Sequence, residues 1–459
     1  MKGIKLLLIG GLVFILTGFT SINGQEKKVW SLEDCVFYAH DHNIQVKQQQ
    51  LNTAYNENTL KQSKIDMAPN LNFNTNYNYA SGRVLDQSTY IYKNQDQVSQ
   101  NLTVSSNVTL FQGLQMLNTV KQNKYTLMAS HEDVERLKND ISVNIALAYL
   151  QILLNKELYE VAVNQLGVSE LQVERTGKLV DAGSIPEGNL FEISAQASRE
   201  EMQVVSVQNM LDISYLNLTQ MLDLDSVGGF EIEVPDLESL FNENYVIPPV
   251  DLVFSDALRG RPEIRGAEYR LKSSEYALKI AKGGRSPRIS LGGNYGTLYS
   301  DTRSKLSVDG GGNIIQEYYP YGDQLKDNQN WGIGVGLSIP IFNGWMVNTN
   351  VNNSKLNIEN YQYELKNTRL QLYKEIQQAH ADALAAVKKY RASEKAVTSM
   401  IESFRYVEQK YNVGLVNSVD YNTTKNQLTQ AQSELLQAKY EYIFMLNVLE
   451  FYRGNPIVL

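Results

Sequence analysis

Residues 70–79 read NLNFNTNYNY, a stretch in which every second residue is an asparagine. Because successive side chains of a β-strand point to opposite faces, the stretch predicts a strand with one amide face and one largely apolar face. The amide face comprises Asn70, Asn72, Asn74, Asn76 and Asn78. A soluble sheet with one wet face has this pattern, and so does the wall of a membrane barrel with lipid outside and water inside. The stretch alone leaves both interpretations open.

Three other segments alternate in the same way, residues 99–110, 288–299 and 330–341. With residues 70–80 they make four predicted strands of about ten residues, the length that crosses a bilayer when tilted. Their aromatic residues fall at two predicted heights, as interfacial solvation favours in a membrane protein. The outer-rim set is Tyr77, Tyr79, Tyr295, Tyr299 and Trp331, and the inner-rim set is Phe111, Phe342 and Trp345.

The first 24 residues have the pattern of a secretory signal peptide, with Lys2 and Lys5 beside an apolar run that ends in small and polar residues. Farther along, no segment has the ~20 uninterrupted apolar residues of a membrane helix, so any membrane crossing of the mature chain is expected to use strands. The formal net charge is −8, and no basic run with interleaved aromatics occurs, which argues against nucleic acid as a partner.

The chain contains a twofold internal similarity. TLFQG at 109–113 recurs as PIFNG at 340–344, an offset of 231, and the same offset relates Gly183 to Gly414. Farther upstream, Pro69 corresponds to Pro287 at an offset of 218. We therefore expect an insertion in the second half, and the glycine-rich DGGGN after residue 308 is the natural place for it.

Each half is predicted to contain a helix, a strand, a loop, a strand, a very long helix, a turn and a further helix. The first repeat spans 25–223, with a helix at 32–68, strands at 70–80 and 99–110, and helices at 113–182 and 187–223. The second spans 261–450, with a helix at 262–284, strands at 288–299 and 330–341, and helices at 345–412 and 418–450. An equatorial segment at 224–260 and a C-terminal tail at 451–459 complete the division, with candidate strands at 230–234 and 456–459.

The two longest predicted helices lack proline and carry apolar residues at three-four spacing, so each would be about 100 Å long and would pair in an antiparallel coiled coil. Four strands do not close a barrel, and an open edge in hydrocarbon leaves backbone groups unpaired. Two copies would give eight strands with a nearly filled bore, whereas three copies give twelve. The sequence therefore predicts an α+β membrane protein, a homotrimer in which a twelve-stranded barrel continues into a helical barrel and asparagines line a water-filled lumen.

Several stretches together resemble the TolC family of outer-membrane efflux proteins. They are residues 31–79, the LFQG and IFNG junctions between strand and helix, and YNVGLVNSVDYNTTKNQLTQAQSELLQAKYEYI at 411–443. The resemblance implies a trimeric duct through the outer membrane and periplasm of a Gram-negative bacterium. It would pass small molecules or proteins delivered by an inner-membrane pump and a periplasmic adaptor protein, without a cofactor and without enzymatic activity.

The resemblance also assigns the helix-to-helix turns to the periplasmic tips of the duct. The residues expected to dock the adaptor are Gly183, Ser184, Ile185, Val413, Gly414 and Leu415. A local explanation for the glycines is sufficient as well, because glycine supplies the positive φ that ends a helix, and Ser418 with Asp420 starts the next one. Three acids lie at the same turns, Asp181, Glu187 and Asp420. They are explained either by helix-end electrostatics or by an acidic entrance that favours cations.

Other interpretations have less support. His40 and His42 lie two apart on a predicted helix and so point to different sides, which disfavours a metal site. Cys35, the only cysteine, is predicted to be a packed thiol and not a lipid attachment site. No catalytic motif stands out. The remaining alternative is a periplasmic coiled-coil structural protein with a small soluble sheet, and the identity of the cargo stays open.

Overall fold

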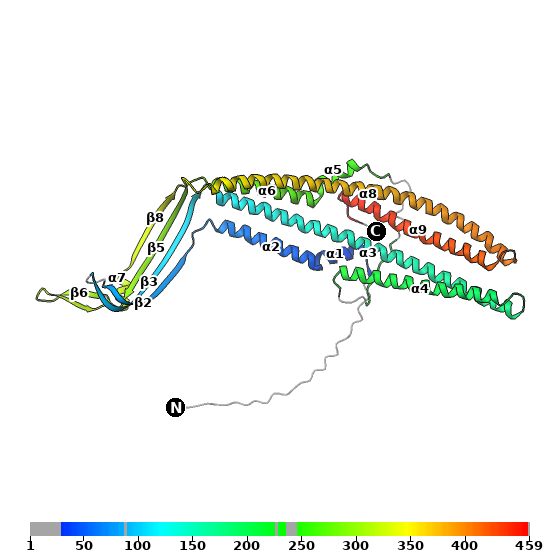
Figure 1. The fold of residues 1–459 in the computed structure, drawn as a ribbon, viewed down its shortest axis with the longest axis horizontal. Coiled ribbons are helices and arrows are strands. Elements are labelled where there is room, and N and C mark those ends of the chain that lie inside the picture. The colour runs from blue at the N-terminus through cyan, green and yellow to red at the C-terminus, as the bar shows by residue number, and fades with distance from the viewer. Residues whose placement is uncertain (1–28, 87–89, 225–227, 236–245, 458–459) are drawn as a thin grey trace, which may run out of the picture.

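The structure, a computed structural model, describes residues 29–86, 90–224, 228–235 and 246–457. The signal peptide expected at residues 1–24 lies outside these ranges. The molecule is elongated, with a β-sheet at one end and long helices that run to the other end (Figure 1). Within the described ranges, none of the helices combines the length and the hydropathy of a membrane span.

A four-stranded antiparallel sheet has the order β2-β3-β5-β8, so β2 and β8 are its two open edges. The strands are β2 (Asn72–Asp86), β3 (Ile91–Gln112), β5 (Arg288–Ser300) and β8 (Asn330–Ser338). The β2–β3 hairpin is longer than expected, because the ladder continues through residues 81–86 and 91–98, which were predicted to be a loop, up to the pair Asp86 and Ile91. In the second half, β8 ends three residues earlier than expected, at Ser338, before Pro340.

The loop expected between 299 and 330 contains structure of its own. Strands β6 (Ser304–Val308) and β7 (Ile314–Tyr318) form a hairpin, and the short helix α7 (Tyr321–Asp327) follows it. The DGGGN stretch is the hairpin turn, where the Asp309 carboxylate accepts hydrogen bonds from the backbone N–H groups of Gly311 and Asn313 at 2.9 and 2.8 Å. An aspartate that bonds to its own turn in this way favours a tight connection.

The first helix was predicted to be continuous over 32–68, and this is wrong. It consists of α1 (Leu32–His42) and α2 (Ile44–Ile65), separated at Asn43, whose ψ is 129°. The Asn43 side chain accepts hydrogen bonds from the N–H groups of Gln45 and Val46. It therefore caps α2, which is the way a short amide side chain competes with continued helix.

Two helical hairpins form the long part of the molecule. One consists of α3 (Gln115–Asp181) and α4 (Gly188–Met221), the other of α8 (Met346–Asn412) and α9 (Ser418–Tyr452). Each of α3 and α8 is 67 residues long, and they begin 231 residues apart. Each also follows two consecutive left-handed residues, which are Gly113 and Leu114 before α3, and Gly344 and Trp345 before α8. The chain thus turns from strand into helix by the same sharp corner in both halves.

The shorter helices match in length as well. Helix α5 (Val250–Gly260) has 11 residues like α1, and α6 (Pro262–Gly283) has 22 residues like α2. Both pairs begin 218 residues apart. Helix α5 belongs to the segment that was expected to be equatorial.

The largest apolar core lies where α1, α3, α4 and α9 meet a small parallel pair of strands, β1 (Val29–Trp30) and β4 (Glu231–Ile232). Tyr149 of α3 is 1% exposed, and its hydroxyl lies 2.7 Å from the carbonyl oxygen of Glu233 and 3.1 Å from that of Trp30. Burial raises the pKa of Tyr149. Strand β4 falls within the candidate strand at 230–234. Pro456 and Ile457 of the candidate strand at 456–459 are not in a strand, and the rest of it lies outside the described residues.

Candidate functional site

The register of the sheet sorts its side chains by chemistry. Phe73, Val104, Tyr295 and Trp331 lie in one row across the four strands. The neighbouring row consists of Asn72, Ser105, Asn294 and Gly332. Because directly paired residues of an antiparallel ladder point to the same side, the four strands place most aromatic and aliphatic residues on one face and most amides, hydroxyls and glycines on the other.

Both faces are exposed in a single chain. On the apolar face, Trp331 is 75% exposed, Ile333 is 74% exposed and Val335 is 70% exposed. An exposed apolar surface of this extent marks a membrane or protein contact. The predicted amides at 72, 74, 76 and 78 lie on the opposite face of β2, and Asn70 precedes the strand and accepts a hydrogen bond from the N–H of Asn107 at 2.7 Å.

Of the aromatic residues predicted at the outer rim, Tyr299 lies near the end of β5 and Trp331 near the start of β8, with Tyr77 in the same row as Tyr299, whereas Tyr295 is in the middle of β5. On their own hairpin, however, Tyr77 and Tyr79 are mid-strand, because β2 and β3 continue beyond them. Of the inner-rim set, Phe342 and Trp345 are 82% and 64% exposed, close to the corner between β8 and α8.

Helix α7 and the residue after it complete the sheet next to the start of β8, which the sequence did not predict. The buried Gln324 amide donates to the carbonyl of Ser300 at 2.9 Å and accepts from its N–H at 3.0 Å. Asn328 donates to the carbonyl of Leu298 at 2.9 Å. These side-chain amides take the place of strand partners for β5 beyond its last pair with β8, so the open backbone groups there are satisfied.

The two helix-to-helix turns have the same geometry. Gly183 and Gly414 have positive φ, 67° and 76°. In both turns the glycine N–H bonds to the carbonyl three residues back, and the next N–H bonds to the carbonyl five residues back. This is the Schellman motif, which requires the left-handed conformation that glycine adopts without strain. Val413 and Leu415 are 70% and 76% exposed beside Gly414, whereas Ile185 is half-buried.

Polar contacts join the tips of the two hairpins. The Ser418 hydroxyl donates to the Glu192 carboxylate, and Arg175 donates to the side-chain oxygen of Asn412 at 2.9 Å. Helix α9 begins at Ser418. Asn417, the residue before the helix, is its cap, and the Asn417 side chain accepts a hydrogen bond from the N–H of Asp420 at 2.8 Å.

The remaining predicted residues are dispersed. Asp181, Glu187 and Asp420 are exposed near the tips. His40 lies 2.9 Å from the Ser142 hydroxyl, and His42 stacks on Tyr38 with ring centroids 4.0 Å apart. Over the described part of the chain, no group of three or more His, Cys, Asp or Glu residues is arranged to hold a metal ion.

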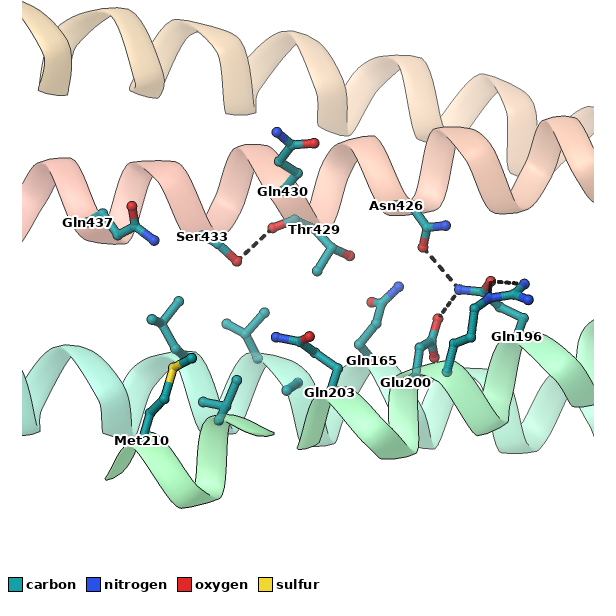
Figure 2. A pocket seen from close by; sticks show the side chains of 15 residues that line it. Gln165, Gln196, Glu200, Gln203, Met210, Asn426, Thr429, Gln430, Ser433 and Gln437 are labelled. Atoms are coloured by element: carbon teal, nitrogen blue, oxygen red, sulfur yellow. Dashed lines mark hydrogen bonds between the residues drawn. The ribbon is translucent and has the colours of Figure 1, made fainter. Parts of the chain in front are cut away.

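A buried polar cluster joins the hairpins farther from the tips. The Lys425 ammonium of α9 lies 3.2 Å from the Glu200 carboxylate of α4 and 2.6 Å from the Ser169 hydroxyl of α3. Gln196 donates to Glu200 at 2.8 Å and to Asn426 at 3.1 Å (Figure 2). Desolvation lowers the pKa of Lys425, and the Glu200 charge opposes this shift. No sequence pattern predicted this pair, whose members are 225 residues apart.

Beside the cluster, a cavity of about 550 Å³ opens between α3, α4 and α9. Its lining mixes apolar residues with side-chain amides, among them Gln165, Gln203, Gln430 and Gln437 (Figure 2). The cavity therefore separates α4 from α9 over part of their length, and the buried ion pair bridges that separation at its edge.

Comparisons with known proteins agree with this architecture. The family described as Outer membrane efflux protein matches residues 253–455. The chain is 21% identical to Outer membrane protein TolC of Escherichia coli (strain K12), over 98% of this chain and 86% of that protein. It is 20% identical to the Alkaline protease secretion protein AprF of Pseudomonas aeruginosa, over 71% of this chain and 64% of that protein.

Among solved structures, the outer membrane protein VceC of Vibrio cholerae has the same fold. The TM-score is 0.73 at 16% identity, over 93% of this chain and 97% of that chain. The fold, with its amphipathic sheet and long helical hairpins, is thus that of outer-membrane channels.

Over nearly its whole length the chain is thus similar to the TolC family of outer-membrane efflux proteins. Members of this family are transport channels and not enzymes. The protein is located in the outer membrane of a Gram-negative bacterium and extends into the periplasm.

Proposed function

We propose that three copies of this chain form an export duct. A twelve-stranded barrel, with four strands from each copy, would cross the outer membrane and continue into a periplasmic barrel of helical hairpins. The observation that carries the proposal is the sheet, which has two open edges and four strands whose registers place the apolar residues on one side.

The open edges require partners in a bilayer. Each backbone group left unpaired in hydrocarbon costs several kcal/mol, and β2 and β8 each present a row of such groups. Closure with three copies gives twelve strands and an aqueous bore, while closure with two gives eight strands whose side chains nearly fill the interior. The exposed apolar face would then meet lipid.

The opposite face would line the lumen. Its amides, hydroxyls and glycines are uncharged, so they are solvated by water without selecting strongly for one sign of charge. Asn74, for example, shares its row with Thr103 and Gly296. A dry interior with this many amides would leave them without hydrogen-bond partners, at about 1–3 kcal/mol for each buried group.

The internal repeat fits such a duct, because matched lengths of α3 and α8 bring both turns to the same distance from the sheet. The exposed Val413 and Leu415 beside Gly414, with Gly183, Ser184 and Ile185 at the other turn, would dock a periplasmic adaptor protein that connects to an inner-membrane pump. Asp181, Glu187 and Asp420 would form an acidic entrance. The cargo would be small molecules or proteins, selected chiefly by the pump.

The test is the mass and the channel activity of the detergent-extracted mature protein in a planar bilayer. We expect a trimer with stable conductance. A soluble monomer without conductance, released from membranes by salt, would instead identify a periplasmic coiled-coil structural protein and would overturn the duct.

A further inference from the structure

The first and second halves of the chain contact each other through one continuous interface. In the sheet, β3 of the first half pairs with β5 of the second. Among the helices, α3 packs on α6, where Tyr125 stacks on Tyr276 with ring centroids 5.5 Å apart. This interface runs from the sheet along the part of the helices nearest to it (Figure 1).

The equivalent interface on the other side of each half is open. At the offset of 231, β3 and α3 correspond to β8 and α8, and at the offset of 218, β5 and α6 correspond to β2 and α2. In one chain β8 and β2 are opposite edges of the sheet. Leu51 and Tyr55 of α2 are 70% and 73% exposed, and Leu356 and Tyr363 of α8 are each 63% exposed.

We propose that β8 and α8 of one copy pack on β2 and α2 of the next copy in the register that β3 and α3 show on β5 and α6. The proposal rests on the duct described above and specifies which residues of neighbouring copies meet. The interface seen inside the chain would then continue around the ring, alternating between contacts within a copy and contacts between copies.

The sheet register follows from one observed pair. Val104 pairs with Tyr295 inside the chain. Adding 231 to the number of the first residue and subtracting 218 from that of the second gives Val335 opposite Tyr77 of the next copy. The same shift gives Ile333 opposite Tyr79, Gly334 opposite Asn78, and Gly336 opposite Asn76. Apolar residues meet apolar residues and glycines meet asparagines, although none of these residues was used to obtain the offsets. A shift by one residue would place apolar residues opposite amides.

The glycines support this register independently. Inside the chain, asparagine side chains lie over glycines of the neighbouring strand: a Cβ on Gly292 would be 2.7 Å from the side-chain oxygen of Asn107, and one on Gly332 would be 3.2 Å from that of Asn294. Gly334 has nothing within 4 Å of its Cβ position. The place over Gly334 is therefore open for the Asn78 side chain of the next copy.

The same two offsets convert observed contacts between α3 and α6 into expected contacts between α8 of one copy and α2 of the next. Tyr125 and Tyr269, with ring centroids 6.3 Å apart, correspond to Leu356 and Leu51. The ion pair of Glu132 with Arg265 corresponds to Tyr363 and Lys47. The contact of Thr126 with Ser273, 3.0 Å between hydroxyls, corresponds to Asn357 and Tyr55. On α8, Leu356, Tyr363 and Leu370 lie seven residues apart and are all exposed, which is the stripe a second helix covers.

Cysteine cross-linking of the full mature chain in outer membranes tests the register. The helix pair is Leu51→Cys with Leu356→Cys, and its matched control is Leu51→Cys with Tyr363→Cys, displaced by about 10 Å along α8. The sheet pair is Tyr79→Cys with Ile333→Cys, and its control is Thr75→Cys with Ile333→Cys, displaced by about 13 Å along β2. The native Cys35 is buried and stays in place.

After mild oxidation, we expect both predicted pairs to give covalent trimers in non-reducing electrophoresis, with each control pair and each single variant remaining mostly uncrosslinked. The mass of every variant in detergent under reducing conditions shows whether it assembles. If trimers conduct but the displaced pairs cross-link and the predicted ones do not, the register is wrong while the duct stands. If no variant and no wild-type protein assembles or conducts, the duct itself is wrong.

Discussion

The centre of the molecule and its sheet differ in how much they depend on other chains. At the centre, Ile145 and Ile152 are fully buried around Tyr149, and the core is complete within one chain. In the sheet, Trp331 and Ile333 are about three-quarters exposed, and two edges are open. The helical centre is thus packed within one chain, whereas in the proposed duct the sheet would obtain its environment from lipid and neighbouring copies.

The largest effect is expected at the turn that we propose docks the adaptor protein. Gly414→Trp should abolish export while the trimer stays intact, because Gly414 has positive φ and lies at the proposed adaptor site. The measurement is a transport assay in cells together with the trimer mass. Gly454→Trp is the matched control, since Gly454 also has positive φ with open space around it but is far along the chain from the tips. Normal export by the Gly414 variant would refute the docking site.

A strong effect is also expected where the two hairpins meet in the interior. Lys425→Ala should lower the free energy of unfolding by about 3–5 kcal/mol, because it leaves the buried Glu200 charge without its partner. Urea unfolding followed by circular dichroism measures this. The double variant Lys425→Met with Glu200→Gln removes both charges and should recover most of the loss. Equal destabilisation by the single and double variants would show that the ion pair is not responsible.

The difference in packing between the helical centre and the sheet is tested by replacing one isoleucine with valine in each region. Ile152→Val should cost about 0.5–1.5 kcal/mol of unfolding free energy, as deletion of a buried methylene usually does. Ile333→Val should change it by less than about 0.5 kcal/mol, as at most exposed positions. Both are read from thermal unfolding in the same detergent. A larger cost at Ile333 would show that the sheet face is packed against protein.

Alkaline pH should weaken the packing near the tips. Burial raises the pKa of Tyr421 from 10.0 to about 12. The folded state thus keeps a proton that the unfolded state loses, so this stabilisation is complete below pH 10 and is lost as the pH rises from 10 to 12. Tyr421→Phe should make the unfolding free energy fall less steeply across that window. An unchanged slope would contradict the assignment.

The smallest effect concerns the acids at the tips. Asp181→Asn and Asp420→Asn should each reduce the preference of the channel for cations without changing its assembly, since they remove exposed negative charge near the proposed entrance. Reversal potentials in a planar bilayer under a salt gradient measure this preference. Glu57→Gln on the exposed surface of α2 is the control. Unchanged selectivity in the Asp181 and Asp420 variants would leave helix-end electrostatics as their explanation.

The features that could be predicted from the sequence are periodic or local. The alternation at residues 70–79 reports strand faces because side-chain direction follows the backbone period, and the register across all four strands agrees with it. The glycines at 183 and 414 report helix ends because only that residue type adopts the required φ readily. Such signals are contained in a few consecutive residues.

The features that were missed depend on contacts between distant residues or on side-chain competition. The Lys425 and Glu200 pair joins helices from different halves, and neither residue differs in its sequence context from an exposed one. Gln324 replaces a strand partner for Ser300, which depends on where β8 begins. The break at Asn43 arises because its side chain binds the backbone that a continuous helix would use.

The corner between β3 and α3 fixes the direction in which the long helix α3 leaves the sheet. A Cβ on Gly113 would lie 2.4 Å from the carbonyl oxygen of Gly283, so no larger residue fits there without displacing the backbone of α6. Helix α3 then continues for 67 residues, which is about 100 Å at 1.5 Å per residue. A change of about 2° in its direction at the corner would move its far end by about 3.5 Å, roughly the width of an atom. The direction of the far tip of α3 is thus set where the helix leaves the sheet.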